Sequence, residues 1–160
     1  MKGFGEYAVA DIMTVDPLVI AQDETLHSAL EIFADNRVSA IPVVDKHNKV
    51  VGILSIADLV NLLREVQTDL SALWAANQND RDYLLGALKE ESGQMLISEI
   101  MSTPVETVKA THNVIVAAQI MAREQFRHLP VVDSHHHPVG MLSSTDFVRA
   151  IADIGALMAG

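Results

Sequence analysis

One unit is written twice in this chain of 160 residues. The stretch SAIPVVDKHNKVVGILSIADLV, residues 39–60, returns as RHLPVVDSHHHPVGMLSSTDFV, residues 127–148. Pro42 and Pro130 stand 130 − 42 = 88 positions apart, and the same offset relates other pairs of identical residues. A unit repeated in this way folds twice into the same supersecondary structure, and neighbouring copies bury each other's apolar faces.

The repeat divides the chain into five segments. Its register holds without an insertion over residues 9–64 and 97–152, and we interpret residues 9–64 and 96–152 as two equivalent domains. Residues 65–95 then form a connector, because every insertion falls between the copies. Residues 1–8 are an N-terminal segment, and residues 153–160 are a C-terminal tail.

The apolar periods follow the same order in both copies. Residues 25–38 and 113–126 carry apolar side chains at helical spacing, so each stretch predicts an amphipathic helix. Two short β-branched runs come next, separated by KHNK or SHHHP, and predict an antiparallel strand pair. A second helix is predicted after Ser55 or Ser143, where aspartate follows three positions later. With PLVI and PVETV as opening extended segments, each copy is predicted as strand, helix, strand, strand, helix, an α+β fold.

The composition excludes several classes of function. A formal net charge of −10 opposes binding to nucleic acid or to an anionic membrane surface. The absence of cysteine excludes a disulfide framework, a thiolate nucleophile and a cysteine-ligated zinc site. The segment MKGFGEYAVADIM is unlike a signal peptide, and no apolar run approaches the roughly 20 residues of a membrane span. We therefore expect a cytoplasmic protein, and the lack of hydrolase or Walker motifs predicts that it is not an enzyme.

The ordered set of motifs resembles a known family. A segment MT..P or MS.P, an amphipathic helix, IPVVD or LPVVD, a turn, and GILSIAD or GMLSSTD succeed one another twice. This order resembles the CBS domain, and the tandem resembles a CBS pair, also called a Bateman module. The resemblance implies two units packed about a pseudo-two-fold axis, with two clefts for adenine nucleotides or related adenosyl ligands. It also implies a regulatory protein that forms a homodimer and controls a partner protein.

The pattern Gly-x-x-Ser-x-x-Asp is complete in both copies, from Gly52 to Asp58 and from Gly140 to Asp146. A helix N-terminus offers unpaired N–H groups and a positive dipole end, which suit a phosphate. An aspartate one turn into the helix can accept hydrogen bonds from both hydroxyls of a ribose, while the serine reaches ribose or phosphate. The family's pattern has the same roles, so both helix starts are candidate binding sites.

The candidate residues form one set for each cleft. The resemblance adds apolar walls for an adenine to the motif residues, and nearby cations would assist a phosphate. The second cleft has more cationic help, because Arg127 and His128 stand where the first copy has Ser39 and Ala40. Site 1 comprises Val15, Pro17, Arg37, Ile41, Pro42, Ser55 and Asp58. Site 2 comprises Thr103, Val105, Arg127, His128, Leu129, Pro130, Ser143, Ser144, Thr145 and Asp146.

Two of these features have a second interpretation. The Ser-x-x-Asp side chains can cap the helix by themselves, in which case no ligand is required. The run His135, His136 and His137 consists of metal-ligating side chains. Adjacent residues of a tight turn point in different directions, however, and only Asp133 stands close by, so we predict a solvated turn and no metal site.

The connector, residues 65–95, is the part of this chain that a compact pair of repeats would lack. Its apolar residues predict two amphipathic helical stretches, broken near NQND. These stretches either cover the module's own core or form a docking surface for a partner or a second copy of the chain. The apolar positions are Leu70, Leu73, Trp74, Tyr83, Leu84, Ala87 and Leu88.

The sequence therefore predicts a stand-alone regulatory module that senses AMP, ADP, ATP or S-adenosylmethionine and requires no other cofactor. Contacts to adenine and ribose are common to these ligands, so the motifs do not distinguish among them. Ligand binding should stabilise one relative arrangement of the two units, because only differential affinity transmits a signal. The alternative function is a dimerisation or scaffold module that needs no ligand.

Overall fold

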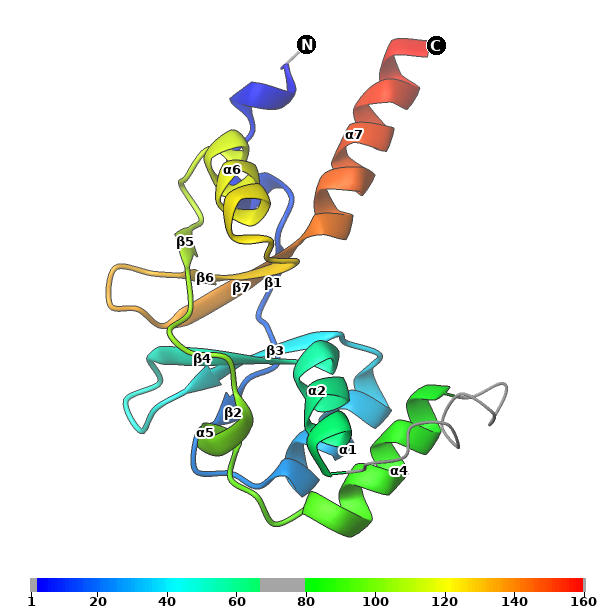
Figure 1. Cartoon of the computed structure of the whole chain (residues 1–160). Helices are drawn as coiled ribbons and strands as arrows, with labels where there is room; N and C mark the ends of the chain where they lie inside the picture. Colours follow the sequence, from blue (N-terminus) through cyan, green and yellow to red (C-terminus); the bar gives the residue numbers. More distant parts are fainter. Residues whose placement is uncertain (1–2, 67–79, 160) are drawn as a thin grey trace. The chain divides into compact units, whose positions relative to one another are not determined.

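The structure is a computed structural model that describes residues 3–66 and 80–159, and the chain divides into two compact units (Figure 1). Unit 1 consists of Met1–Leu18, Asn48–Val50 and Val105–Gly160, and unit 2 consists of Val19–His47 and Val51–Pro104. Each unit therefore combines most of one repeat with a segment that precedes the other repeat's first helix.

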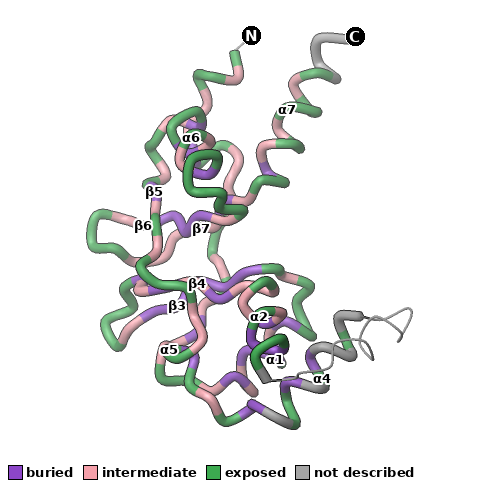
Figure 2. The backbone as a smooth tube through the Cα atoms, viewed as in Figure 1, coloured by how far each residue is buried: buried purple, intermediate pink, exposed green. Residues whose placement is uncertain are grey.

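Unit 2 holds a three-stranded sheet in the order β2-β3-β4, with β2 parallel to β3. Apolar residues of the sheet and of its helices form one core, seen as buried segments in Figure 2. The elements are β2 (Ile20–Ala21), α1 (Leu26–Asn36), β3 (Ala40–Val44), β4 (Val50–Ser55), α2 (Ile56–Val66), α4 (Asp80–Ser92) and α5 (Ile97–Ile100).

Helix α1 illustrates why the sequence folds as predicted. Leu26, Ala29, Leu30 and Phe33 follow helical spacing, and all four are buried. The helix ends where Arg37 adopts a left-handed conformation, with φ 45°. The spacing that predicts the helix thus also defines the face that packs in the core.

Helix α4 belongs to the connector and packs against α1 and α2. Its Leu85 and Leu88 are buried in the same cluster as Leu62 and Leu63 of α2. The second of the two predicted helical stretches therefore contributes to the core of unit 2. The predicted first stretch, with Leu70, Leu73 and Trp74, lies outside the described residues.

Unit 1 holds a four-stranded sheet in the order β1-β7-β6-β5. Strand β7 is antiparallel to both β1 and β6, and β5 is parallel to β6. A second core lies between this sheet and α6 and includes Val108, Met121 and Leu129. The elements are the 3₁₀ helices η1 (Phe4–Glu6) and η2 (Val9–Asp11), then β1 (Thr14–Val15), β5 (Val108–Lys109), α6 (Val114–Glu124), β6 (His128–Val132), β7 (Pro138–Ser143) and α7 (Ser144–Ala159).

The segment ahead of each repeat's first helix pairs with the last strand of the other repeat. In unit 1, Thr14 and Val15 pair with Met141 and Gly140. In unit 2, Ser102 forms an antiparallel bridge with Ile53. The exchange was not predicted from the sequence, because each copy is complete along the chain and nothing in its pattern indicates a crossed pairing.

The pairing between segments of different repeats explains the glycine of each Gly-x-x-Ser-x-x-Asp motif. A Cβ added at Gly140 would lie 2.6 Å from Met13 Sδ and 2.9 Å from the carbonyl oxygen of Thr14. A Cβ at Gly52 would lie 2.5 Å from Met101 Sδ and 3.1 Å from a carbonyl oxygen. We call the segments that contain Met13 and Thr14, and Met101 and Ser102, the crossing segments. Only glycine allows a crossing segment to approach the strand this closely.

The predicted α+β class and the order strand, helix, strand, strand, helix are confirmed. The first copy gives β2-α1-β3-β4-α2, and the second gives β5-α6-β6-β7-α7. The opening strands β2 and β5 lie at the ends of the predicted segments PLVI and PVETV. Packing of the units about a pseudo-two-fold axis stays a prediction. Within residues 3–66 and 80–159, no helix has the length and apolar character needed to span a membrane.

Candidate ligand-binding sites

The Ser-x-x-Asp motif of unit 2 forms a closed capping arrangement at the start of α2. The Ser55 backbone N–H donates to Asp58 Oδ2 over 2.7 Å, and the Ser55 hydroxyl donates to the same oxygen over 2.8 Å. The Asp58 N–H returns a bond to Ser55 Oγ at 3.4 Å. The two side chains therefore satisfy the backbone N–H groups of Ser55 and Asp58.

Unit 1 repeats this arrangement at the start of α7. Asp146 Oδ2 accepts from the backbone N–H of Ser143 at 2.7 Å and from its hydroxyl at 2.8 Å, and the Asp146 N–H donates back at 3.3 Å. Asp146 is only 8% exposed. Both copies thus hold a carboxylate in a fixed orientation.

The second carboxylate oxygen has a different neighbour in each unit. Asp58 Oδ1 accepts a 2.7 Å hydrogen bond from the hydroxyl of Ser102, which reaches α2 on the crossing segment. Asp146 Oδ1 lies 3.8 Å from Nη1 of Arg149, one turn further along α7. The first contact joins the carboxylate to a hydroxyl, and the second brings a guanidinium to it.

A cavity adjoins each motif aspartate. The cavity of unit 1 has a volume of about 440 Å³, and that of unit 2 about 180 Å³. Every residue that lines the smaller cavity has its equivalent, at the offset of the repeat, in the larger one. The smaller is lined by Asp58, Asn61, Leu62, Glu65, Met95, Glu99 and Ile100, and the larger by Tyr7, Asp11, Ile12, Met13, Thr14, Asp146, Arg149, Ala150, Asp153 and Ile154.

The two linings differ in charge. The cavity of unit 2 is lined by three carboxylates and by no lysine or arginine. The cavity of unit 1 also has three carboxylates, but Arg149 replaces Asn61. A third cavity, of about 430 Å³, runs along α1 and contains none of the predicted site residues.

The cationic residues predicted for site 2 lie beside the start of α7. His128 pairs with Ser143 across β6 and β7, and the Arg127 carbonyl accepts a 3.0 Å bond from the Ser144 N–H. Burial lowers the pKa of His128, the Asp146 carboxylate opposes this shift, and the Arg127 guanidinium adds to it. Arg127, His128 and Ser143 therefore lie together at the start of α7, and Thr145 is exposed on its first turn.

The remaining predicted residues lie in several places. Val105 is half-buried, and Arg37 forms the C-cap of α1. The four wall residues on β3 and β6 are buried, and two of them, Ile41 and Leu129, belong to the hydrophobic cores. None of these side chains lines the two cavities. The buried residues on β3 and β6 are Ile41, Pro42, Leu129 and Pro130.

The exchange of segments also divides the predicted site 1 between the two units. Val15 and Pro17 belong to unit 1, where Val15 pairs with Gly140. Thr103, predicted for site 2, belongs to unit 2 and donates a 3.1 Å bond to the carbonyl of Val51. Grouping Val15 with Ser55, or Thr103 with Asp146, joins residues of different units and stays a prediction.

Several residues near the motif aspartates were missed by sequence reasoning. Ser102 and Arg149 contact the motif carboxylates, yet neither belongs to the predicted sets. Ile12 lines the cavity of unit 1, and its equivalent Ile100 lines the cavity of unit 2. Because the two residues are identical at the offset of the repeat, the sequence could have indicated that they share a role. The sequence alone did not indicate that Ile12 would lie beside α7 of the second repeat, or Ile100 beside α2 of the first.

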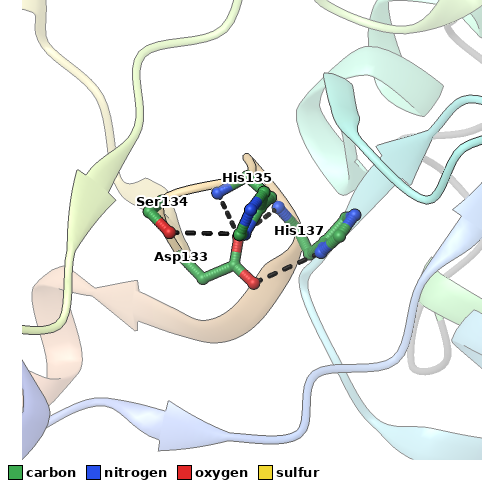
Figure 3. Close-up of polar contacts among 4 residues, drawn as sticks. All are labelled: Asp133, Ser134, His135 and His137. Carbon is green, nitrogen blue, oxygen red and sulfur yellow. Dashed lines mark hydrogen bonds and ion pairs between the residues drawn. The ribbon is translucent and has the colours of Figure 1, made fainter.

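The histidine turn is organised around Asp133, as Figure 3 shows. Its Oδ1 accepts from the backbone N–H groups of His135 at 2.8 Å and His137 at 2.9 Å, and its Oδ2 lies 3.2 Å from His137 Nδ1. The hydrogen bond from the His137 N–H is the main cause that lowers the pKa of Asp133. In the described part of the chain, no group of three or more histidine, aspartate or glutamate residues is placed to hold a metal ion.

Comparison with known proteins defines the class. The family model of the CBS domain matches residues 9–65 and 97–153, so the chain belongs to the CBS domain family and contains two copies of the domain. It is 29% identical over 153 residues to the uncharacterized protein MJ1426 of Methanocaldococcus jannaschii, covering 89% of this chain and 90% of that protein. It is also 29% identical to the chloroplastic CBSX1 of Arabidopsis thaliana, covering 94% of this chain and 66% of the relative.

Solved structures show the same fold. The crystal structure of CBSX2 in complex with AMP superposes with a TM-score of 0.70 at 26% identity, covering 93% of this chain and 98% of that one. The CBS pair of protein MJ0100, solved with 5′-methylthioadenosine and S-adenosyl-L-methionine, gives a TM-score of 0.67 at 22% identity, covering 92% and 97%. The resemblance to a CBS pair that the sequence motifs indicate is confirmed.

Proposed function

We propose that this protein is a regulatory module that binds an adenosyl ligand at the starts of α2 and α7. The observation that carries the proposal is the repeated Ser-x-x-Asp helix start, in which an oriented carboxylate adjoins a cavity in each unit. The lining carboxylates act as hydrogen-bond acceptors, and the helix start supplies N–H donors.

The contacts of Asp58 and Asp146 suit the recognition of a ribose. Each carboxylate uses Oδ2 in the cap and keeps the lone pairs of Oδ1 for a further donor. In unit 2 that donor is the hydroxyl of Ser102, and a ribose hydroxyl makes the same kind of charge-assisted bond. In unit 1, Arg149 and Arg127 provide cations for a phosphate near the same helix start.

Two relatives support an adenosyl ligand. CBSX2, whose fold this chain shares at 26% identity, was crystallised with AMP. The gamma-3 subunit of 5′-AMP-activated protein kinase from Sus scrofa is 31% identical over 138 residues, although the match covers only 23% of that protein. AMP is accordingly the first ligand to test, followed by ADP, ATP and S-adenosylmethionine.

The proposed regulation works through differential affinity. A ligand that binds one relative arrangement of the two units more tightly shifts the population toward it, and a partner protein responds to that arrangement. We further propose that the module is not itself an enzyme, acts in the cytoplasm and self-associates as a homodimer. No other cofactor is part of the proposal.

A scaffold module without a ligand is the second candidate function. The observation that favours it is the closed cap, because Ser55 and Asp58 already satisfy each other and the backbone of α2. In that case the motif stabilises two helix starts and has no further role.

Calorimetric titration of AMP into Asp146→Asn and Asp58→Asn separates the two functions. Asparagine keeps an oxygen that accepts from the backbone N–H of Ser143 or Ser55, so the cap and the fold survive. Loss of the charge should weaken binding at the altered site about tenfold or more, since bonds to a charged group contribute roughly 1.5–3 kcal/mol. If the wild-type chain binds none of the four adenosyl compounds, or if both variants bind like wild type, the assignment of these sites is wrong.

A further inference from the structure

The turn between β6 and β7 brings two histidine side chains together. The rings of His135 and His137 lie nearly parallel, with their centroids 5.9 Å apart and an angle of 21° between their planes. His136 separates them in the chain and adopts a left-handed conformation, with φ 69°. The sequence predicts that adjacent side chains of this turn diverge, but the two that meet are not adjacent. The structure therefore forms a pair of imidazoles that the run of three histidines did not indicate.

Both rings of this pair are held through Nδ1 (Figure 3). His137 Nδ1 lies 3.2 Å from Asp133 Oδ2, and an ionised carboxylate only accepts, so Nδ1 carries the proton. His135 Nδ1 lies 3.3 Å from the hydroxyl oxygen of Ser134, which can accept from it in the same way. Within residues 3–66 and 80–159, no hydrogen bond reaches Nε2 of either ring. A neutral imidazole protonated at Nδ1 has its metal-binding lone pair on Nε2.

We propose that His135 and His137 bind one divalent transition metal ion, such as zinc, copper or nickel, through their Nε2 atoms. Metal–nitrogen bonds of about 2.0–2.1 Å fit between two rings at this separation after a small ring rotation. Imidazole ligands favour these metals over magnesium and calcium. Asp133 is a positioning residue, because a carboxylate on the other ring nitrogen orients a metal-binding histidine. Water completes the coordination, since both histidines are accessible to solvent.

The backbone of the turn is ordered without a metal. The Asp133 N–H donates to the His137 carbonyl oxygen at 3.0 Å, and the His136 N–H donates to the Asp133 carbonyl oxygen at 3.1 Å. Asp133 Oδ1 also accepts from the backbone N–H groups of His135 and His137. The metal therefore has only side chains to order, which reduces the entropic cost of binding.

The equivalent turn of the first repeat has the same backbone but lacks the pair of histidines. Asp45 accepts a 2.8 Å bond from the His47 N–H, and Asn48 is left-handed with φ 58°. Lys49 stands where the second turn has His137. The turn thus folds without a second histidine, so its fold does not account for His137. The net charge of −10 adds a general attraction for a cation.

Calorimetric titration of zinc chloride into the untagged chain, without nucleotide, tests the site. The wild-type chain should bind one equivalent, and an excess of magnesium should not displace it. His137→Lys, which copies the first turn, should weaken zinc binding at least about tenfold, as the loss of even a supporting group does. His136→Asn is the matched control, because Asn48 adopts the same conformation in the first turn, and it should bind like wild type. Thermal unfolding without zinc checks that both variants fold.

Two results would overturn the site. One is a wild-type chain that binds no zinc, or a His137→Lys variant that binds it as tightly as wild type. The other is an equal loss of affinity in His136→Asn and His137→Lys, which would mean that zinc binds to exposed histidines without regard to their pairing. Because the turn lines neither motif cavity, titration with AMP reports on the proposed adenosyl sites separately.

Electron paramagnetic resonance with copper(II) counts the ligands directly. The wild-type spectrum should show two coordinated nitrogens, and His135→Ala should show one. Asp133→Asn keeps an oxygen for the backbone N–H groups but exerts no charge on His137, so it should lower the affinity for copper about tenfold and leave two nitrogens in the spectrum. A single nitrogen in wild type would contradict the pair, and an unchanged affinity in Asp133→Asn would contradict the role of Asp133.

Discussion

The cavity at the start of α7 and the cavity at the start of α2 occupy equivalent positions, yet they differ in size and charge. The cavity of unit 1 is the larger, about 440 Å³ against about 180 Å³, and Arg149 stands in it where unit 2 has Asn61. The same capping bonds recur in both. The duplicated backbone thus keeps the carboxylate in place, while the surrounding side chains set the size and the charge of each cavity.

The largest expected effects on the free energy of unfolding come from substitutions in the cores of the two units. Phe33 and Met121 are equivalent residues of α1 and α6, and Phe33 is fully buried while Met121 is slightly exposed. Phe33→Ala should reduce the free energy of unfolding by about 4 kcal/mol and Met121→Ala by about 3 kcal/mol, because both leave a cavity. Urea unfolding of the two variants measures this, and equal losses below 1 kcal/mol would show that neither helix packs as described.

The motif glycines give the next largest effect. Gly140→Ala should destabilise the protein by about 2 kcal/mol, because its Cβ would approach the Thr14 carbonyl oxygen at 2.9 Å and backbone cannot move aside easily. Gly52→Ala should cost less, since its closest carbonyl contact is 3.1 Å. Thermal unfolding ranks the two variants. Gly86→Ala on α4 is the control, with open space around it and an expected gain of up to about 1 kcal/mol.

An exchange of Arg149 and Asn61 sharpens the comparison of the cavities. Arg149→Asn should weaken AMP binding in unit 1 by about threefold to tenfold, because it removes a cation beside a phosphate site. Asn61→Arg should strengthen binding in unit 2 by a similar factor. Titration calorimetry at two salt concentrations measures both effects, and an affinity that responds to neither change would remove Arg149 from the ligand site.

The smallest expected effect is a dependence of stability on pH. Burial lowers the pKa of His128 below its ordinary value of about 6.5. Below that pH the unfolded chain binds a proton that the folded chain does not, so stability falls as the pH drops from 7 toward the lowered pKa. His128→Ala places there the residue found at the equivalent Ala40. The unfolding midpoint of His128→Ala should therefore vary less between pH 7 and pH 5 than that of wild type. An identical pH profile would contradict a lowered pKa of His128 in the folded chain.

Much of the fold was predictable because the signals are local. The apolar spacing of residues 25–38 indicates the helix that the structure shows as α1, and Ser55 with Asp58 marks the start of α2. The grouping of residues around each carboxylate was not predictable. Ser102 reaches Asp58 because the crossing segment bridges to Ile53, and such a pairing depends on tertiary contacts that leave no periodicity in the sequence.

The crossing of segments also sets an order on the synthesis of this chain. Strand β1 is translated well before its partner β7, which ends at Ser143, so the two can meet only after the residues between them have been made. Val15 and its partner Gly140 are far apart in sequence, and such distant pairings close slowly. A nascent chain released before β7 is complete would carry an unpaired β1 and an unfinished unit 1. Synthesis of β7 must therefore be complete before β1 can pair in the sheet of unit 1.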